Sequence, residues 1–278
     1  VDLSSGKISV EKPETSFYRR YFGGWGFITY YLLKELKPGV DALGPENKLI
    51  FATGVVTGSP VPGSARSSVG AKSPLTGGFG GAETGGFWGV ELKQAGFDAV
   101  IVEGEAEKPV YLWINDGEAE IRDASHLWGK DTGESQAMIR KELGDDGIRV
   151  AQIGLAGENL VRYACVINDL RDAAGRSGLG AVMGSKKLKA VAVRGHNRVK
   201  TVDSEKLRDL AKLVTDKFKL WRFRRIGTGG DMYDVYPETG NLPTRNFRDA
   251  GFPYAKDISA QAIEKTILVR MEGCWGCT

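Results

Sequence analysis

The chain has 278 residues, of which 41% are apolar and 26% are charged, and its formal net charge is +3. This composition is typical of a soluble globular protein, and the small charge without a long basic run argues against a nucleic-acid partner. No apolar run reaches the length of a membrane span. Three cysteines do not form a disulfide framework, so we expect a reducing, cytoplasmic setting.

Residues 1–200 read as strands and short helices separated by glycine. The opening segment Val1–Ile8 reads as a strand and turn already under way, so we expect further residues upstream. Four later segments have clear patterns: a hairpin from Pro109–Ile114 through the turn Asn115–Gly117 to Ala119–Arg122, an amphipathic helix over Ser135–Leu143 ending near Gly144, and buried strands at Ile148–Ile153 and Ala190–Val193. The alternation is too irregular for a doubly wound sheet and predicts an α+β domain built from two related sheets.

The pattern changes near residue 200, and we place a domain boundary at 198–203. Asp203 or Ser204 is expected to cap a long helix. The basic stretch 217–225, which contains interleaved aromatic residues, is interpreted as a solvated helix face. A second helix is predicted over Ala260–Met271, and it leads the chain to Cys274.

One passage occurs twice. Residues 85–104 and 176–195 each contain a glycine-rich loop, a short helical stretch and an apolar strand that ends on glycine, at a constant offset of 91 residues. The pair Leu188-Lys189 is assigned to the second helical stretch, and Arg162 is matched to Arg66. Such a repeat suits a ligand with two similar halves or two copies of one ligand. The alternative is that any two helix–strand units look alike.

The glycine loops carry arginines. Arg66 precedes the first loop, and Arg171 and Arg176 surround the second. Glycines let backbone N–H groups approach an anion, and arginine adds bidentate phosphate recognition, so the loops predict an anionic cofactor. The spacing matches neither a Rossmann fingerprint nor a Walker A loop. The alternative is that these glycines only permit close packing of helix on strand.

The last residues form a C-x2-C pair, Cys274 and Cys277. Two thiolates at this spacing can bind one metal or one edge of an iron–sulfur cluster, but either site needs four ligands. The remaining ligands would then come from elsewhere, or the pair is redox-active. Cys165 lies in an apolar run and is interpreted as a core residue.

Several motifs along nearly the whole chain occur in a family-specific order and spacing: Asp41–Ile50, Lys72–Gly77, Gly85–Lys93, Gly157–Asn159 and Ala173–Lys186. In this respect the chain resembles the N-terminal portion of the tungsten-containing aldehyde:ferredoxin oxidoreductase family. The resemblance implies a bis-pterin cofactor-binding domain over residues 1–200, with two sheets, an internal repeat and pseudo-twofold symmetry. It implies that residues 201–278 begin an α-helical domain that carries the first iron–sulfur cysteines.

The resemblance also implies site residues. Arg66 resembles the arginine that binds the pterin phosphate, and Gly85, Ala173 and Gly175 resemble backbone contacts to the cofactor. Cys274 and Cys277 resemble the first two ligands of a 4Fe-4S cluster. The other two cluster ligands and the catalytic residues are expected beyond Thr278, in a longer chain.

Two positions depart from the family pattern. Glu83 stands where the best-known members carry Asn, and Asp172 stands where they carry Arg. A Mg2+ ion that bridges the pterin phosphates could tolerate the Glu83 carboxylate. Asp172 cannot replace a phosphate-binding arginine, although its neighbours Arg171 or Arg176 could.

The implied activity is oxidation of an aldehyde to a carboxylate at a tungsten or molybdenum bis-pterin centre. Electrons would pass through the 4Fe-4S cluster to ferredoxin or to an iron–sulfur electron-transfer subunit, in a homo-oligomer or a larger complex. One alternative is a reductase subunit of the same family that acts on a thioester or an aromatic acid. Another is a non-catalytic scaffold subunit.

Overall fold

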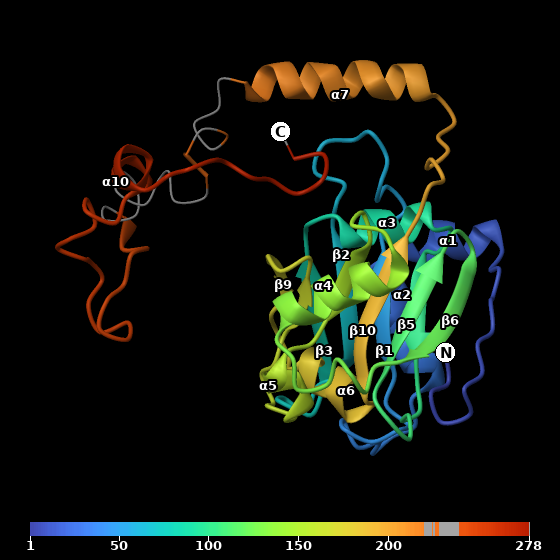
Figure 1. Cartoon of the computed structure of the whole chain (residues 1–278). Coiled ribbons are helices and arrows are strands. Elements are labelled where there is room, and N and C mark those ends of the chain that lie inside the picture. Colours follow the sequence, from blue (N-terminus) through green and yellow to red (C-terminus); the bar gives the residue numbers. More distant parts are fainter. Residues whose placement is uncertain (220–223, 225, 228–238, 278) are drawn as a thin grey trace. The chain divides into compact units, whose positions relative to one another are not determined.

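The structure is a computed structural model that describes residues 1–219, 224, 226–227 and 239–277 (Figure 1). Its contacts divide the chain into two units. The first unit comprises Val1–Ser204 together with Cys274–Cys277, and the second comprises Glu205–Gly273.

The first unit contains two sheets with helices between and around them. Its helices are α1 (Thr15–Tyr21), α2 (Trp25–Glu35), α3 (Trp88–Gln94), α4 (Thr132–Leu143), α5 (Leu155–Glu158) and α6 (Leu179–Ser185). Its strands are β1 (Leu49–Thr53), β2 (Ser67–Lys72), β3 (Phe79–Thr84), β4 (Ala99–Val102), β5 (Val110–Asn115), β6 (Glu118–Asp123), β7 (Arg149–Gln152), β8 (Val166–Asn168), β9 (Asp172–Ala174) and β10 (Leu188–Arg194). The predicted α+β architecture with two sheets is confirmed.

The two sheets repeat one strand order. The four-stranded sheet has the order β3-β2-β1-β4, and the six-stranded sheet contains β9-β8-β7-β10 followed by β5 and β6. All neighbouring strands within these two sets of four are antiparallel. Helices α3 and α6 both have seven residues and follow the third strand of each set, at the offset found in the sequence. The repeat therefore describes two copies of one structural unit.

The hydrophobic core joins the two copies. Phe51 and Val69 of the first sheet and Val191 of the second belong to one cluster of buried residues. Trp88, at the start of α3, is 1% exposed, and its indole N–H donates to the carbonyl of Val191 at 2.9 Å. Buried Trp side chains usually find a partner for the indole N–H, and here that partner is a strand of the second copy. The bond therefore holds α3 of the first copy on β10.

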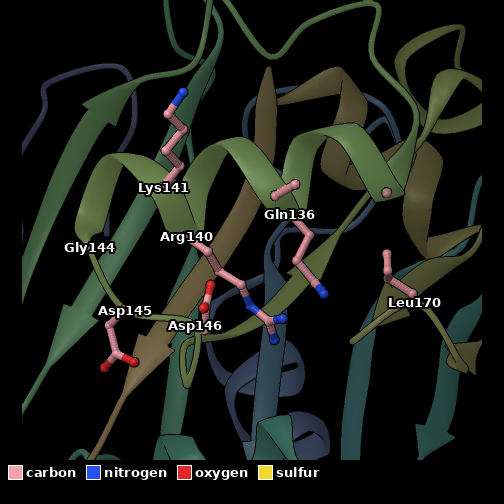
Figure 2. Close-up of a pocket in the computed structure, with 9 residues that line it drawn as sticks. Gln136, Arg140, Lys141, Gly144, Asp145, Asp146 and Leu170 are labelled. Atoms are coloured by element: carbon pink, nitrogen blue, oxygen red, sulfur yellow. The ribbon is translucent and has the colours of Figure 1, made fainter.

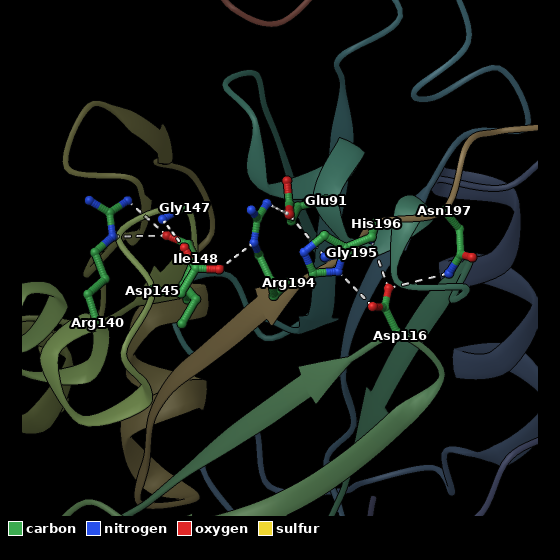
Figure 3. Close-up of polar contacts among 10 residues, drawn as sticks. All are labelled: Glu91, Asp116, Arg140, Asp145, Gly147, Ile148, Arg194, Gly195, His196 and Asn197. Atoms are coloured by element: carbon green, nitrogen blue, oxygen red, sulfur yellow. Dashed lines mark hydrogen bonds and ion pairs between the residues drawn. The ribbon is translucent and has the colours of Figure 1, made fainter.

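A polar network makes the same connection near the end of β10 (Figure 3). Arg194 pairs with Glu91 of α3 at 2.8 Å and with Asp145, after α4, at 2.6 Å. The backbone N–H of Gly147 and the Arg194 guanidinium hold the pKa of Asp145 below its usual value. The network therefore ties α3, β10 and the loop after α4 together.

Glycines allow helix to lie directly on strand in both copies. A Cβ atom at Gly180 in α6 would lie 2.4 Å from the carbonyl oxygen of Cys165. A Cβ atom at Gly89 in α3 would lie 2.7 Å from Cβ of Ser67. At these two positions the packing interpretation of the glycines is correct, and any cofactor must be bound by other residues.

Several local predictions are confirmed, and two are wrong. The hairpin forms as β5 and β6, with positive φ at Asp116 and Gly117, and α4 ends at Gly144 in the left-handed conformation. Leu188-Lys189 begins β10 and is not helical, because this segment pairs with β5 and both residues are buried in the sheet. In the second unit, α10 (Ala260–Thr266) ends five residues earlier than Met271.

Helix α7 (Ser204–Phe218) starts at the predicted cap region, and from Glu205 onward it belongs to the second unit. The apolar residues Leu210 and Leu213 of this helix are about half exposed. Residues 220–223 and 225 of the basic stretch lie outside the described residues. None of the helices within the described part of the chain is long and apolar enough to cross a membrane.

Lys186 is fully buried and donates to the carbonyls of Pro45 and Gly104. Burial lowers its pKa from 10.5 to about 8. Between these two pH values the unfolded chain binds more protons, so Lys186 makes stability rise with pH. In denaturant titrations, we expect the unfolding free energy of the wild type to increase relative to that of Lys186→Met as the pH rises from 8 to 10. Parallel pH profiles would contradict this.

Candidate functional site

The edge strands of the two sheets, β3 and β9, lie side by side. The hydroxyl of Ser73 donates to the carbonyl of Ser177 at 2.8 Å, and a Cβ atom at Gly80 would lie 2.9 Å from Cβ of Ser177. At the other end, a Cβ atom at Gly86 would lie 2.6 Å from the Asp172 carboxylate. The two strands therefore run antiparallel past each other, and the two copies of the repeat meet at their glycine loops.

Strand register shows which residues of the two copies correspond. In the first sheet, Glu83 of β3 stands at the same level of the strand ladder as Ala99 of β4, through pairs in β2 and β1. In the second sheet, Ala173 of β9 stands at the same level as Ala190 of β10, through pairs in β8 and β7. Glu83 and Ala173 therefore hold equivalent positions, and Gly85 and Gly175 follow them at equal distance. Both Glu83 and Ala173 are exposed.

Arg66 is exposed and directly precedes β2. Its neighbour Ser67 pairs with Thr84, so Arg66 lies beside Gly85. By register the equivalent of Arg66 is Cys165, which directly precedes β8, and the match of Arg66 to Arg162 is wrong. Cys165 is also half-buried and at the edge of the second loop, not in the core.

Glu83 has a partner that the sequence did not indicate. Its carboxylate accepts a hydrogen bond from the indole N–H of Trp25 at 2.5 Å. The Trp25 ring covers Gly81, where a Cβ atom would lie 2.1 Å from the ring, and lies 5.6 Å from the Phe79 ring. Trp25 therefore orients the Glu83 carboxylate, and a glycine at 81 makes room for it.

A tight turn positions the second loop. Asp169 and Leu170, between β8 and β9, have φ values of 48° and 67°, and the N–H of Arg171 donates to the carbonyl of Asn168 at 3.1 Å. This is the geometry of a type I′ hairpin turn. Burial raises the pKa of Asp169. After the turn, Asp172 is half-buried, whereas the other predicted residues of the loop are exposed: Arg171, Ala173, Gly175 and Arg176.

The C-x2-C segment packs on the first glycine loop. The N–H of Trp275 donates to the carbonyl of Gly86 at 3.2 Å, and the N–H of Gly63 donates to the carbonyl of Gly276 at 3.1 Å. The N–H of Cys277 donates to the carbonyl of Cys274 at 3.0 Å, which closes the turn. Cys274 is half-buried and Cys277 is exposed, and neither is in a disulfide.

The surroundings of Gly85 show that the glycine loops and the cysteine turn fit a cofactor and a cluster side by side. A Cβ atom at Gly85 would lie 2.5 Å from Sγ of Cys274. The glycine therefore brings the predicted cluster ligand against the loop predicted to bind the cofactor. With exposed Arg66 next to Gly85 and exposed Arg176 after Gly175, the donor set fits an anionic cofactor at the two loops.

The two cysteines do not complete a metal site. Among the described residues, no three His, Cys, Asp or Glu side chains come together in a way that could bind a metal ion. A four-ligand cluster would therefore need ligands that this part of the chain does not supply.

A surface hollow lies elsewhere, along α4 (Figure 2). It is lined by residues that include Gln136, Arg140 and Leu170, and by none of the predicted site residues. The guanidinium of Arg140 donates twice to the carbonyl of Ile148, at 3.0 and 2.8 Å, so its main role is to hold the end of α4. We therefore assign no site to this hollow.

Comparisons with known proteins agree on one family. Residues 1–195 match the model described as "Aldehyde ferredoxin oxidoreductase, N-terminal domain", and residues 205–278 match the model of domains 2 and 3 of the same family. The tungsten-containing aldehyde ferredoxin oxidoreductase of Pyrococcus furiosus is 45% identical over the whole chain. The chain spans 46% of that relative's length.

Other relatives have different names. The aliphatic sulfonate oxidoreductase, WOR-like subunit, of Pyrococcus furiosus is 37% identical over 90% of this chain and 42% of its own. Among solved structures, the active site complex BamBC of benzoyl coenzyme A reductase with 1,5-dienoyl-CoA matches with a TM-score of 0.86 and 35% identity. That match covers the whole of this chain and 45% of the other.

Proposed function

The chain belongs to the aldehyde ferredoxin oxidoreductase family, and on this premise we propose that it forms the cofactor-binding part of a tungsten or molybdenum bis-pterin oxidoreductase. The proposed reaction oxidises an aldehyde to a carboxylate, with the added oxygen taken from water and the electrons passed to an electron carrier. The observation that carries the proposal is the meeting of two equivalent glycine loops beside the C-x2-C turn. Two similar loops suit two pterins, and the adjacent cysteines suit an electron-transfer cluster.

The predicted site residues would contact different parts of the cofactor. Arg66, Arg171 and Arg176 would bind pterin phosphates, because arginine recognises phosphate through two parallel hydrogen bonds. The backbone at Gly85, Ala173 and Gly175 would approach the cofactor closely. Glu83, oriented by Trp25, would face a Mg2+ ion that bridges the phosphates, since this cation prefers carboxylate and phosphate oxygens.

In this proposal the protein binds and orients the cofactors. A bound bis-pterin metal centre would supply the two-electron oxidation chemistry, and the residues of this chain would bind and orient it. Cys274 and Cys277 would provide two of four ligands to a 4Fe-4S cluster. Electrons would pass to ferredoxin or to an iron–sulfur subunit in a homo-oligomer or larger complex, in the cytoplasm.

Domain roles follow the same proposal. Residues 1–200 would form the bis-pterin domain, and 201–278 would begin the helical part that carries the first cluster cysteines.

A second candidate function is reduction of a thioester or an aromatic acid. The similarity to the benzoyl coenzyme A reductase complex favours it. A substrate screen of the full-length protein, with oxidised and with reduced electron carriers, separates the two. Aldehyde-dependent reduction of an oxidised carrier supports the first candidate, and reduction of a thioester or an aromatic acid by a reduced carrier supports the second.

Arg66→Ala tests cofactor binding directly. We expect the full-length variant to lose most of its tungsten or molybdenum and its pterin. The unfolding free energies of the cofactor-free variant and the cofactor-free wild type should differ by less than about 0.5 kcal/mol, because the side chain is exposed. Metal analysis and pterin quantification after purification measure this. Arg20→Ala, at an exposed arginine of α1, is the matched control and should retain its cofactor. Equal cofactor content in both variants would contradict the role of Arg66.

A further inference from the structure

Asp172 occupies the junction between the two repeat copies and the cysteine turn. Its Oδ1 accepts from Sγ of Cys274 at 3.7 Å, and a Cβ atom at Gly86 would lie 2.6 Å from its Oδ2. Asp172 is half-buried, and within the described part of the chain no ion pair to it is found. Among the described residues, the Asp172 carboxylate therefore lies against a cysteine sulfur without a paired cation.

We propose that Asp172 lowers the reduction potential of the iron–sulfur cluster bound through Cys274. This inference rests on the proposed function, in which the Cys274 sulfur is a cluster thiolate and not the thiol that donates to Asp172. The charge around a cluster and the hydrogen bonds to its sulfurs set its potential. A carboxylate beside the thiolate disfavours the reduced cluster, which carries one more negative charge.

The fold keeps the carboxylate in this place. Asp172 is the first residue of β9, directly after the type I′ turn, and it pairs with Asn168 across the hairpin. Gly85 and Gly86 lack the side chains that would separate it from the cysteine turn. Its effect on the sulfur therefore does not depend on a flexible loop.

The test is a redox titration of the full-length holoprotein, followed by electron paramagnetic resonance of the reduced cluster. Asp172→Asn removes the charge, keeps the shape and offers an N–H to the sulfur, so we expect a more positive midpoint potential. Asp172→Glu keeps the charge and should stay nearer to the wild type. Asp172→Ser gives the same loss of charge with a smaller side chain if the Asn variant does not assemble its cluster.

Glu118→Gln is the matched control for loss of one negative charge. Glu118 is exposed on β6, at the opposite edge of the same sheet from β9. The five strand spacings between them amount to roughly 24 Å, well beyond the Debye length of about 8 Å at physiological salt. We therefore expect the potential of this variant to match that of the wild type.

The outcomes separate the inference from the proposed function. A positive shift in Asp172→Asn or Asp172→Ser, with none in Glu118→Gln, supports the role of Asp172. An assembled cluster with the same potential in all variants overturns that role and leaves the proposed function standing. A wild-type protein that contains no iron–sulfur cluster overturns both.

Discussion

Replacing Lys189 with methionine is expected to lower the free energy of unfolding by about 3–5 kcal/mol. Lys189 is fully buried, forms an ion pair with Glu158, and donates to the carbonyl of Lys130 at 2.8 Å. The Glu158 side chain is 4% exposed and also accepts from the N–H of Gly129 at 2.8 Å. The large cost arises because the substitution leaves the Glu158 carboxylate buried without a cation.

Denaturant-induced unfolding of the full-length protein measures this effect. Lys187→Met is the matched control, since Lys187 pairs with Glu105 at 3.1 Å with both side chains more than a third exposed. Such a surface pair contributes less than about 1 kcal/mol. Adding Glu158→Gln to Lys189→Met should restore part of the stability by removing the unpaired charge. If Lys187→Met and Lys189→Met lose the same free energy of unfolding, the buried pair contributes no more to stability than the exposed pair.

Replacing Gly85 with alanine is expected to remove most of the cluster iron from the full-length protein. The added Cβ atom would lie 2.5 Å from Sγ of Cys274, closer than real Cβ atoms approach a sulfur. A free cysteine could rotate away, but a cluster ligand is held in place by the metal. The variant should therefore lose iron while remaining folded, as judged by iron analysis and circular dichroism.

Gly154→Ala provides the control for adding a methyl group to a loop glycine. Its Cβ atom would make only an ordinary contact, 3.5 Å from the Thr132 methyl carbon. This variant should keep its iron. If Gly85→Ala keeps as much iron as Gly154→Ala, the cysteine turn does not hold a cluster against this loop.

The repeat and the two sheets could be predicted because their signals are local. A glycine loop, a short helix and an apolar strand recur at one offset, and α3 and α6 have the bounds that this offset requires. The hairpin of β5 and β6 follows from turn residues between two short runs. The helical assignment of Leu188-Lys189 is wrong because periodicity over so few residues does not separate helix from strand.

The contacts that make the site could not be predicted, since they join residues far apart in the sequence. Trp25 and Glu83 are 58 positions apart, and Asp172 and Cys274 are 102 positions apart. In both pairs, the sequence around one residue carries no signal that identifies the other residue. The resemblance to a family places Glu83, Asp172 and Cys274 at the site, whereas the two pairings are evident only from the fold.

Metal and pterin analysis of the purified full-length protein tests the central claim most directly. The proposed function predicts tungsten or molybdenum with two pterins per metal atom, together with about four irons per chain for one 4Fe-4S cluster. Protein that contains neither tungsten nor molybdenum, and no iron, would contradict it.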